Sequence, residues 1–123
     1  MKKLVKRVLL DLFIPVKLKT TGSGEDYKEY KSEICSFILS QKKLVKRVNC
    51  DLSITIKFYV NNFRGDIDNL IKPVLDSINM ADIIGDDSQF RRIKAEIIDD
   101  VFEYGMSLRI CRMGGLYERH RII

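Results

Sequence analysis

The sequence predicts an α+β fold: a mixed β-sheet of about four strands flanked by two helices, in a single domain covering residues 1–123. The length of 123 residues suits one compact domain with one core. Apolar stretches with the short period of strands alternate with two segments that have the 3.6-residue period of helices. The composition, 46% hydrophobic and 32% charged, is that of a globular protein.

The first half of the chain predicts a strand, a helix and a second strand. Val8 to Val16 is rich in Leu, Ile and Phe and meets Pro15 near its end, as strands do. Glu25 to Gln41 is predicted as a helix, because its apolar residues recur at helical spacing along one face. Cys50 to Val60 alternates between apolar and polar residues and is predicted as the second strand.

The second half predicts another helix and two more strands. Asn69 to Met80 has one apolar stripe, and Pro73 requires that it lie in the opening turns of this helix. Arg91 to Asp99 and Phe102 to Arg112 are predicted as strands, joined as a hairpin that turns near Asp99 and Asp100. The tail 114–123 has no assignment.

The chain lacks the features of membrane or secreted proteins. No apolar run is long enough to span a bilayer, and Lys6, Arg7 and Asp11 interrupt any signal-peptide core. We therefore expect a cytoplasmic protein. Three cysteines without paired spacing argue against a disulfide framework or a zinc site and predict reduced thiols: Cys35, Cys50 and Cys111.

Charge is distributed unevenly along the chain. Residues 1–50 carry 12 basic and 5 acidic side chains, whereas residues 51–100 carry 6 basic and 10 acidic ones. Basic surfaces attract polyanions, and a group of carboxylates repels them unless cations lie between. The pattern suggests metal-assisted phosphodiester chemistry. Two basic clusters could contact phosphates or equally be solvated: Lys2, Lys3, Lys6 and Arg7, and Lys42, Lys43, Lys46 and Arg47.

The segment from Gly65 to Asp76 holds the most informative residues. Asp66 and Asp68 are two positions apart after an extended segment, so we expect both carboxylates on the same side of the sheet. Carboxylates so placed repel each other unless a hard cation binds between them, and oxygen ligands suit magnesium or manganese. The alternative is that Asp68 and Asn69 simply cap the following helix.

Lys72 lies one turn into the predicted helix, where the helix dipole disfavours a cation. It therefore needs an anionic neighbour. On spacing alone, a surface pair with Asp76 at the i+4 position is as good an explanation as a catalytic role. The same helix start would also receive a phosphate.

Asp86 and Asp87 follow Gly85 in a predicted loop before the third strand. Adjacent acidic residues in a turn are most often solvated. If the third strand pairs beside the second, however, we expect this loop to lie near Asp66 and Asp68. One of the two aspartates would then complete a site of three carboxylates.

These residues together resemble the RusA family of Holliday junction resolvases. The similarity rests on Asp-Ile-Asp-Asn-Leu-Ile-Lys at residues 66–72, on Asp76 in the same helix, and on Asp-Asp-Ser-Gln at residues 86–89. The predicted order of strands and helices extends it over nearly the whole chain. The combination is specific, although its individual pieces are not.

The resemblance implies a homodimer that binds four-way DNA junctions and nicks two strands symmetrically with magnesium or manganese. On matching positions, Asp66, Asp68 and Asp87 resemble the metal-site carboxylates, with Asp86 as the alternative third ligand. Lys72 resembles the essential lysine that stabilises charge on the phosphate or orients the attacking water. Two further readings stay open: a nuclease for other branched DNA, and a non-catalytic DNA-binding protein.

Overall fold

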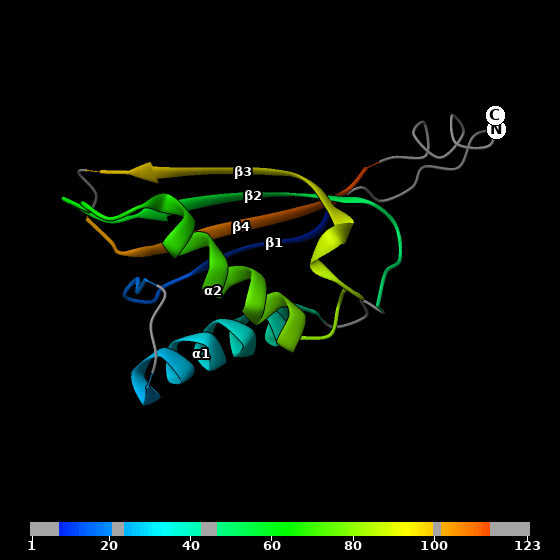
Figure 1. The fold of residues 1–123 in the computed structure, drawn as a ribbon, viewed down its shortest axis with the longest axis horizontal. Helices are drawn as coiled ribbons and strands as arrows, with labels where there is room; N and C mark the ends of the chain where they lie inside the picture. The colour runs from blue at the N-terminus through cyan, green and yellow to red at the C-terminus, as the bar shows by residue number, and fades with distance from the viewer. Residues whose placement is uncertain (1–7, 21–23, 43–46, 100–101, 114–123) are drawn as a thin grey trace.

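The computed structural model describes residues 8–20, 24–42, 47–99 and 102–113. Four strands form one mixed sheet in the order β1-β4-β2-β3, and both helices lie on one face of it (Figure 1). The elements are β1 (Val8–Ile14), α1 (Glu25–Lys42), β2 (Leu52–Tyr59), α2 (Ile67–Met80), the 3-10 helix η1 (Asp87–Gln89), β3 (Phe90–Ile98) and β4 (Gly105–Arg112).

The predicted α+β architecture of about four strands and two helices is confirmed. The one difference at an element start that affects the site is in α2, which begins at Ile67, two residues before the predicted start. Pro73 is the seventh residue of α2, at the end of its second turn, and it is buried. The predicted basic clusters, apart from Arg47 and the backbone of Lys42, and the tail from Gly114 lie outside the described residues.

The predicted hairpin between the last two strands is wrong. β3 pairs in parallel with β2, while β4 lies between β2 and β1 and is antiparallel to both. The periodicity of a strand shows which residues face the core, but it does not show which strand is its neighbour. Helix α2 is the crossover that makes β2 and β3 parallel, and the chain then passes the end of β2 to reach β4.

The core lies between the sheet and the two helices. Alternate residues of β2 are fully buried on the helix-covered face, whereas those between them are only half-buried on the open face. Each fully buried apolar side chain contributes about 1.5 to 3 kcal/mol through removal of its surface from water. The fully buried side chains include Leu52, Ile54, Ile56 and Phe58 of β2, Ile34 and Ile38 of α1, and Leu70 and Ile78 of α2.

A buried hydroxyl joins the two helices. The Oγ of Ser77 in α2 donates to the carbonyl oxygen of Pro73 at 2.7 Å and lies 3.2 Å from the carbonyl oxygen of Lys31 in α1. The contact therefore links α2 to α1 within the core.

The remaining predictions concern the thiols and the membrane. Cys35 is buried, Cys50 and Cys111 are half-buried, and all three are free thiols, as expected. Neither helix in the described part of the chain is long and apolar enough to cross a bilayer.

Candidate active site

The start of α2 presents two aspartates to solvent. Asp66 is the N-cap residue, with extended backbone angles of φ −83° and ψ 139°, and its carbonyl oxygen accepts the backbone N–H of Asn69 at 3.1 Å. The Asp66 carboxylate makes no capping hydrogen bond. Asp68 follows in the first helical turn, and both side chains are exposed.

This arrangement corrects two predictions. Asp66 and Asp68 are not alternate residues of one extended segment, because the helix begins between them. The N-cap is Asp66 rather than Asp68 or Asn69. The positive end of the helix dipole offsets part of the repulsion between the two carboxylates. Both groups nevertheless remain exposed at the same helix end.

Lys72 lies one turn after Asp68 on the same face of α2, and 64% of its side chain is exposed. Its Nζ lies 4.0 Å from Oδ1 of Asp76, so the alternative surface pair is present at the outer limit of an ion pair. Asp76 is also 3.6 Å from the Nζ of Lys31 in α1. Asp76 therefore has a nearer cation, and the Lys72 ammonium stays accessible to a ligand at the helix start.

The loop between β2 and α2 is held by its own side chains. Gly65 lies against the ring of Phe63, and a Cβ at this glycine would come within 2.8 Å of the ring. Asn62 has a left-handed φ of 58°, and its backbone N–H donates to Oδ1 of Asp99 at 3.0 Å. The loop that leads to Asp66 is thus anchored to the end of β3.

Asp99 is a carboxylate at this end of the molecule that sequence reasoning treated as a turn residue. The register that places Tyr59 of β2 beside Ile98 of β3 brings Asp99 to the loop that leads to Asp66. Only knowledge that the two strands are parallel could have indicated this position.

A capping box fixes η1 before β3. The Asp86 carboxylate accepts the backbone N–H of Ser88 at 3.0 Å, and Oε1 of Gln89 accepts the backbone N–H of Gly85 at 2.6 Å and of Asp86 at 3.0 Å. Hydrogen bonds from Ser88, through its side chain and its backbone, lower the pKa of Asp86. The carboxylate is thus ionised, but one of its oxygens is already used.

The Gln89 amide also holds the chain before β2. Its Nε2 donates to the carbonyl oxygens of Val48 at 2.9 Å and Cys50 at 3.0 Å. With the two bonds accepted by Oε1, the side chain joins η1 to a segment about 40 residues away in sequence. This motif residue therefore has a structural role.

Asp87 lies at the opposite end of α2 from Asp66 and Asp68. Asn79, in the last turn of α2, donates from Nδ2 to Oδ1 of Asp87. Helix α2 lies between the two acidic pairs (Figure 1). Its 14 residues make it about 20 Å long. The expectation that the Asp86–Asp87 loop lies near Asp66 is wrong for a single chain. Because β3 is parallel to β2, it starts beside the start of β2, whereas Asp66 follows the end of β2.

The described residues contain no group of three or more His, Cys, Asp or Glu side chains that could hold a metal ion. Asp66 and Asp68 fit a different kind of site. Magnesium is usually bound by one or two carboxylates and completes its six ligands with waters and substrate phosphate oxygens. Two exposed carboxylates, one of them making no capping bond, suit such an ion.

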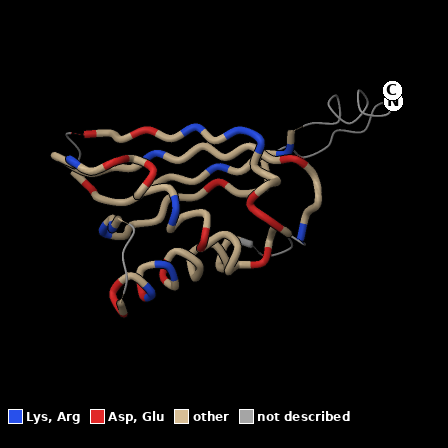
Figure 2. The backbone as a smooth tube through the Cα atoms, in the orientation of Figure 1, with Lys and Arg blue, Asp and Glu red and all other residues tan. Residues whose placement is uncertain are grey.

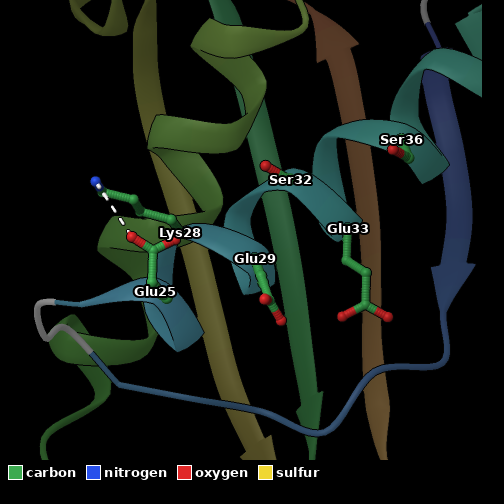
Figure 3. Close-up of a pocket in the computed structure, with 6 residues that line it drawn as sticks. All are labelled: Glu25, Lys28, Glu29, Ser32, Glu33 and Ser36. Atoms are coloured by element: carbon green, nitrogen blue, oxygen red, sulfur yellow. Dashed lines mark ion pairs between the residues drawn. The ribbon is translucent and has the colours of Figure 1, made fainter.

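A shallow hollow of about 470 Å³ lies elsewhere, along the exposed side of α1 (Figure 3). All of its lining residues belong to α1, and none of Asp66, Asp68 and Lys72 is among them. Its acidic lining does not suit a nucleic acid. The lining residues are Glu25, Lys28, Glu29, Ser32, Glu33 and Ser36.

Comparison with known protein families gives a match for this chain. The family model described as Endodeoxyribonuclease RusA matches residues 15–110, a range that includes β2, α2, η1 and β3 and so both acidic pairs. A search of curated proteins gives no match.

Proposed function

Because the chain belongs to the RusA family of endodeoxyribonucleases, we propose that it resolves Holliday junctions by paired nicking with magnesium or manganese, in DNA recombination and repair in the cytoplasm. The observation that carries the proposal is the exposed start of α2. There, two carboxylates and an accessible lysine lie within two helical turns. Carboxylates for a cation beside a lysine for a phosphate are what hydrolysis of a phosphodiester requires.

Each group at the helix start has a distinct role in this proposal. Asp66 and Asp68 would hold the ion, which supplies an activated water and neutralises charge on the phosphate. The N-terminal end of α2 attracts the anionic phosphate through its dipole and backbone N–H groups. Lys72 places its ammonium beside that phosphate and stabilises the charge that develops as the bond breaks.

We propose that Asp87 contributes to the active site of a second protomer. One chain keeps Asp87 about 20 Å from Asp66, so a site that uses both needs two copies. A symmetric four-way junction is also most simply cut by a two-fold protein. We therefore propose a homodimer in which each site combines Asp66, Asp68 and Lys72 of one protomer with Asp87 of the other.

Cleavage assays test the proposal. The purified chain is incubated with a four-way junction, a linear duplex and a flap, each with magnesium or with a chelator. We expect magnesium-dependent paired nicks in the junction only. Cutting of the flap instead would indicate a nuclease for other branched DNA, and binding without cutting would indicate a non-catalytic DNA-binding protein.

Single substitutions assign the carboxylates. Asp66→Asn or Asp68→Asn should abolish cleavage and leave junction binding intact, because each removes a cation ligand without changing the shape of the side chain. Asp26→Asn is the matched control, since it removes an exposed carboxylate from the first turn of the other helix. A variant of Asp66 or Asp68 that cuts as fast as this control would exclude that residue from the site.

A further inference from the structure

Strand β3 forms one edge of the sheet. Its nine residues pair with β2 on one side, and no strand in the described ranges pairs with the other side (Figure 1). Ile93 on this strand is 44% exposed although it points to the helix-covered face. An exposed edge presents unpaired backbone N–H and C=O groups that can pair with another chain.

Charges on β3 are ordered along the strand. Arg91 and Arg92 lie near its start and Lys94 at its middle, while Glu96 lies in its second half and Asp99 follows its end. Figure 2 shows this order as basic positions at the start of β3 and acidic positions toward its end. A strand that is basic at one end and acidic at the other is electrostatically complementary to an antiparallel copy of itself.

We infer that the β3 edge is the surface through which two copies of this chain associate, with the two β3 strands antiparallel and Ala95 opposite Ala95 of the second protomer. This register places Lys94 opposite Glu96 of the second protomer on the open face, twice by symmetry. On the helix-covered face it places Ile93 opposite Ile97.

Neighbouring registers lack this complementarity. Opposed residues must share a face, so symmetric registers differ in steps that move the centre by one residue. A centre at Lys94 places that lysine opposite itself, and a centre at Glu96 does the same for the glutamate. Like charges directly opposite each other destabilise a strand pair. Among the registers centred at Lys94, Ala95 and Glu96, only the centre at Ala95 avoids both contacts, and it also places Ile93 opposite Ile97.

The other edge of the sheet offers no comparable surface. β1 has seven residues and is shorter than β3, which has nine. Its one charged residue, Asp11, already lies 3.7 Å from Arg109 of β4. Self-pairing of β1 would therefore make no pair of opposite charges.

The proposed register also bears on the active site, and this step rests on the proposed function. Antiparallel pairing brings the start of β3 in one protomer beside the end of β3 in the other. Asp87 lies just before the start, and Asp99, which anchors the loop to Asp66, lies just after the end. The pairing thus moves Asp87 of the second protomer toward Asp66 and Asp68 of the first.

Sedimentation of charge-reversal variants tests the interface without any cleavage assay. Lys94→Glu and Glu96→Lys should each weaken the dimer about tenfold or more, because each places like charges opposite each other twice. The double variant should recover the parent dissociation constant. Lys28→Glu and Glu25→Lys on α1 are matched controls, since they change the same charges on another surface.

Cross-linking tests the register. Ala95→Cys should form a disulfide-linked dimer under mild oxidation, because only residue 95 lies opposite itself within disulfide reach. Ile97→Cys, on the same face two residues away, should not, and the parent controls for the natural cysteines. Three outcomes would each overturn the inference. They are a monomeric parent, a dimer that neither Lys94→Glu nor Glu96→Lys weakens, and equal cross-linking at residues 95 and 97. A dimer that passes these tests but cuts no DNA would reject the proposed function alone.

Discussion

Asn79 and Asp87 hold the end of α2 against η1, through the hydrogen bond from Asn79 Nδ2 to Asp87 Oδ1. The contact places Asp87 at the opposite end of α2 from Asp66. One oxygen of the Asp87 carboxylate thus supports its own protomer, and the other is left for a ligand.

Mixing two inactive variants tests whether the site is shared. Asp66→Asn and Asp87→Asn should each lack cleavage, and Asn at residue 87 can still accept the bond from Asn79. Refolding the two together should restore nicking to about a quarter of the parent level, because half of the dimers are mixed and each has one intact site. Activity is measured as single nicks in a labelled junction.

The control for this experiment is a mixture of Asp66→Asn with Asp68→Asn. Both substitutions lie in the same half of the proposed site, so no mixed dimer contains an intact site. If the Asp66→Asn and Asp87→Asn mixture is as inactive as this control, the two acidic pairs do not act across protomers.

The sequence allowed the strands, helices and motif to be predicted because each depends on neighbouring residues. The alternation in β2 and the apolar stripe of α2 indicate burial directly. The order of the strands depends on contacts between distant segments, which periodicity does not contain. The predicted hairpin failed for this reason, and the expected proximity of Asp87 to Asp66 failed with it.

The first residue of α2 could not be predicted from the sequence either. Asp66, Asp68 and Asn69 are all good N-cap residues, so the sequence alone did not decide among them. The structure starts the helix at Ile67, a half-buried residue that packs against the core. Burial of this side chain, rather than capping propensity, accounts for the earlier start.

Gln89→Ala should lower the free energy of unfolding by about 2 to 6 kcal/mol. The substitution removes the hydrogen bonds that the side chain makes to four backbone groups, each with a net contribution of about 0.5 to 1.5 kcal/mol. Urea denaturation followed by circular dichroism measures the loss. Gln41→Ala, at an exposed position in α1, should change little. Equal stability of the two variants would contradict the structural role of Gln89.

Tyr30 should make the fold sensitive to alkaline pH. Burial raises the pKa of Tyr30 to about 12 from 10.0, so the folded state favours the neutral phenol. The buried neutral phenol makes its full contribution to the free energy of unfolding below pH 10. This contribution is lost as the pH rises through 12, which lowers the free energy of unfolding by about 3 kcal/mol. Tyr30→Phe should therefore lose less stability than the parent between pH 9 and about 12. Tyr104→Phe, at an exposed position, should behave as the parent, and identical pH profiles for all three would contradict the assignment.

A substitution of Lys72 tests whether this lysine takes part in cleavage or only forms a surface ion pair. If its ammonium stabilises charge on the scissile phosphate, Lys72→Ala should reduce the single-turnover cleavage rate by about a hundredfold or more. If Lys72 only forms the exposed 4.0 Å pair with Asp76, the rate should stay within a few fold and stability should change by less than about 1 kcal/mol. Saturating enzyme removes junction affinity from the measured rate. Lys28→Ala is the matched control, because it removes an exposed lysine from a similar pair, 3.9 Å from Glu25. A Lys72→Ala rate equal to that of this control would reject the catalytic role and leave the carboxylates as the whole site.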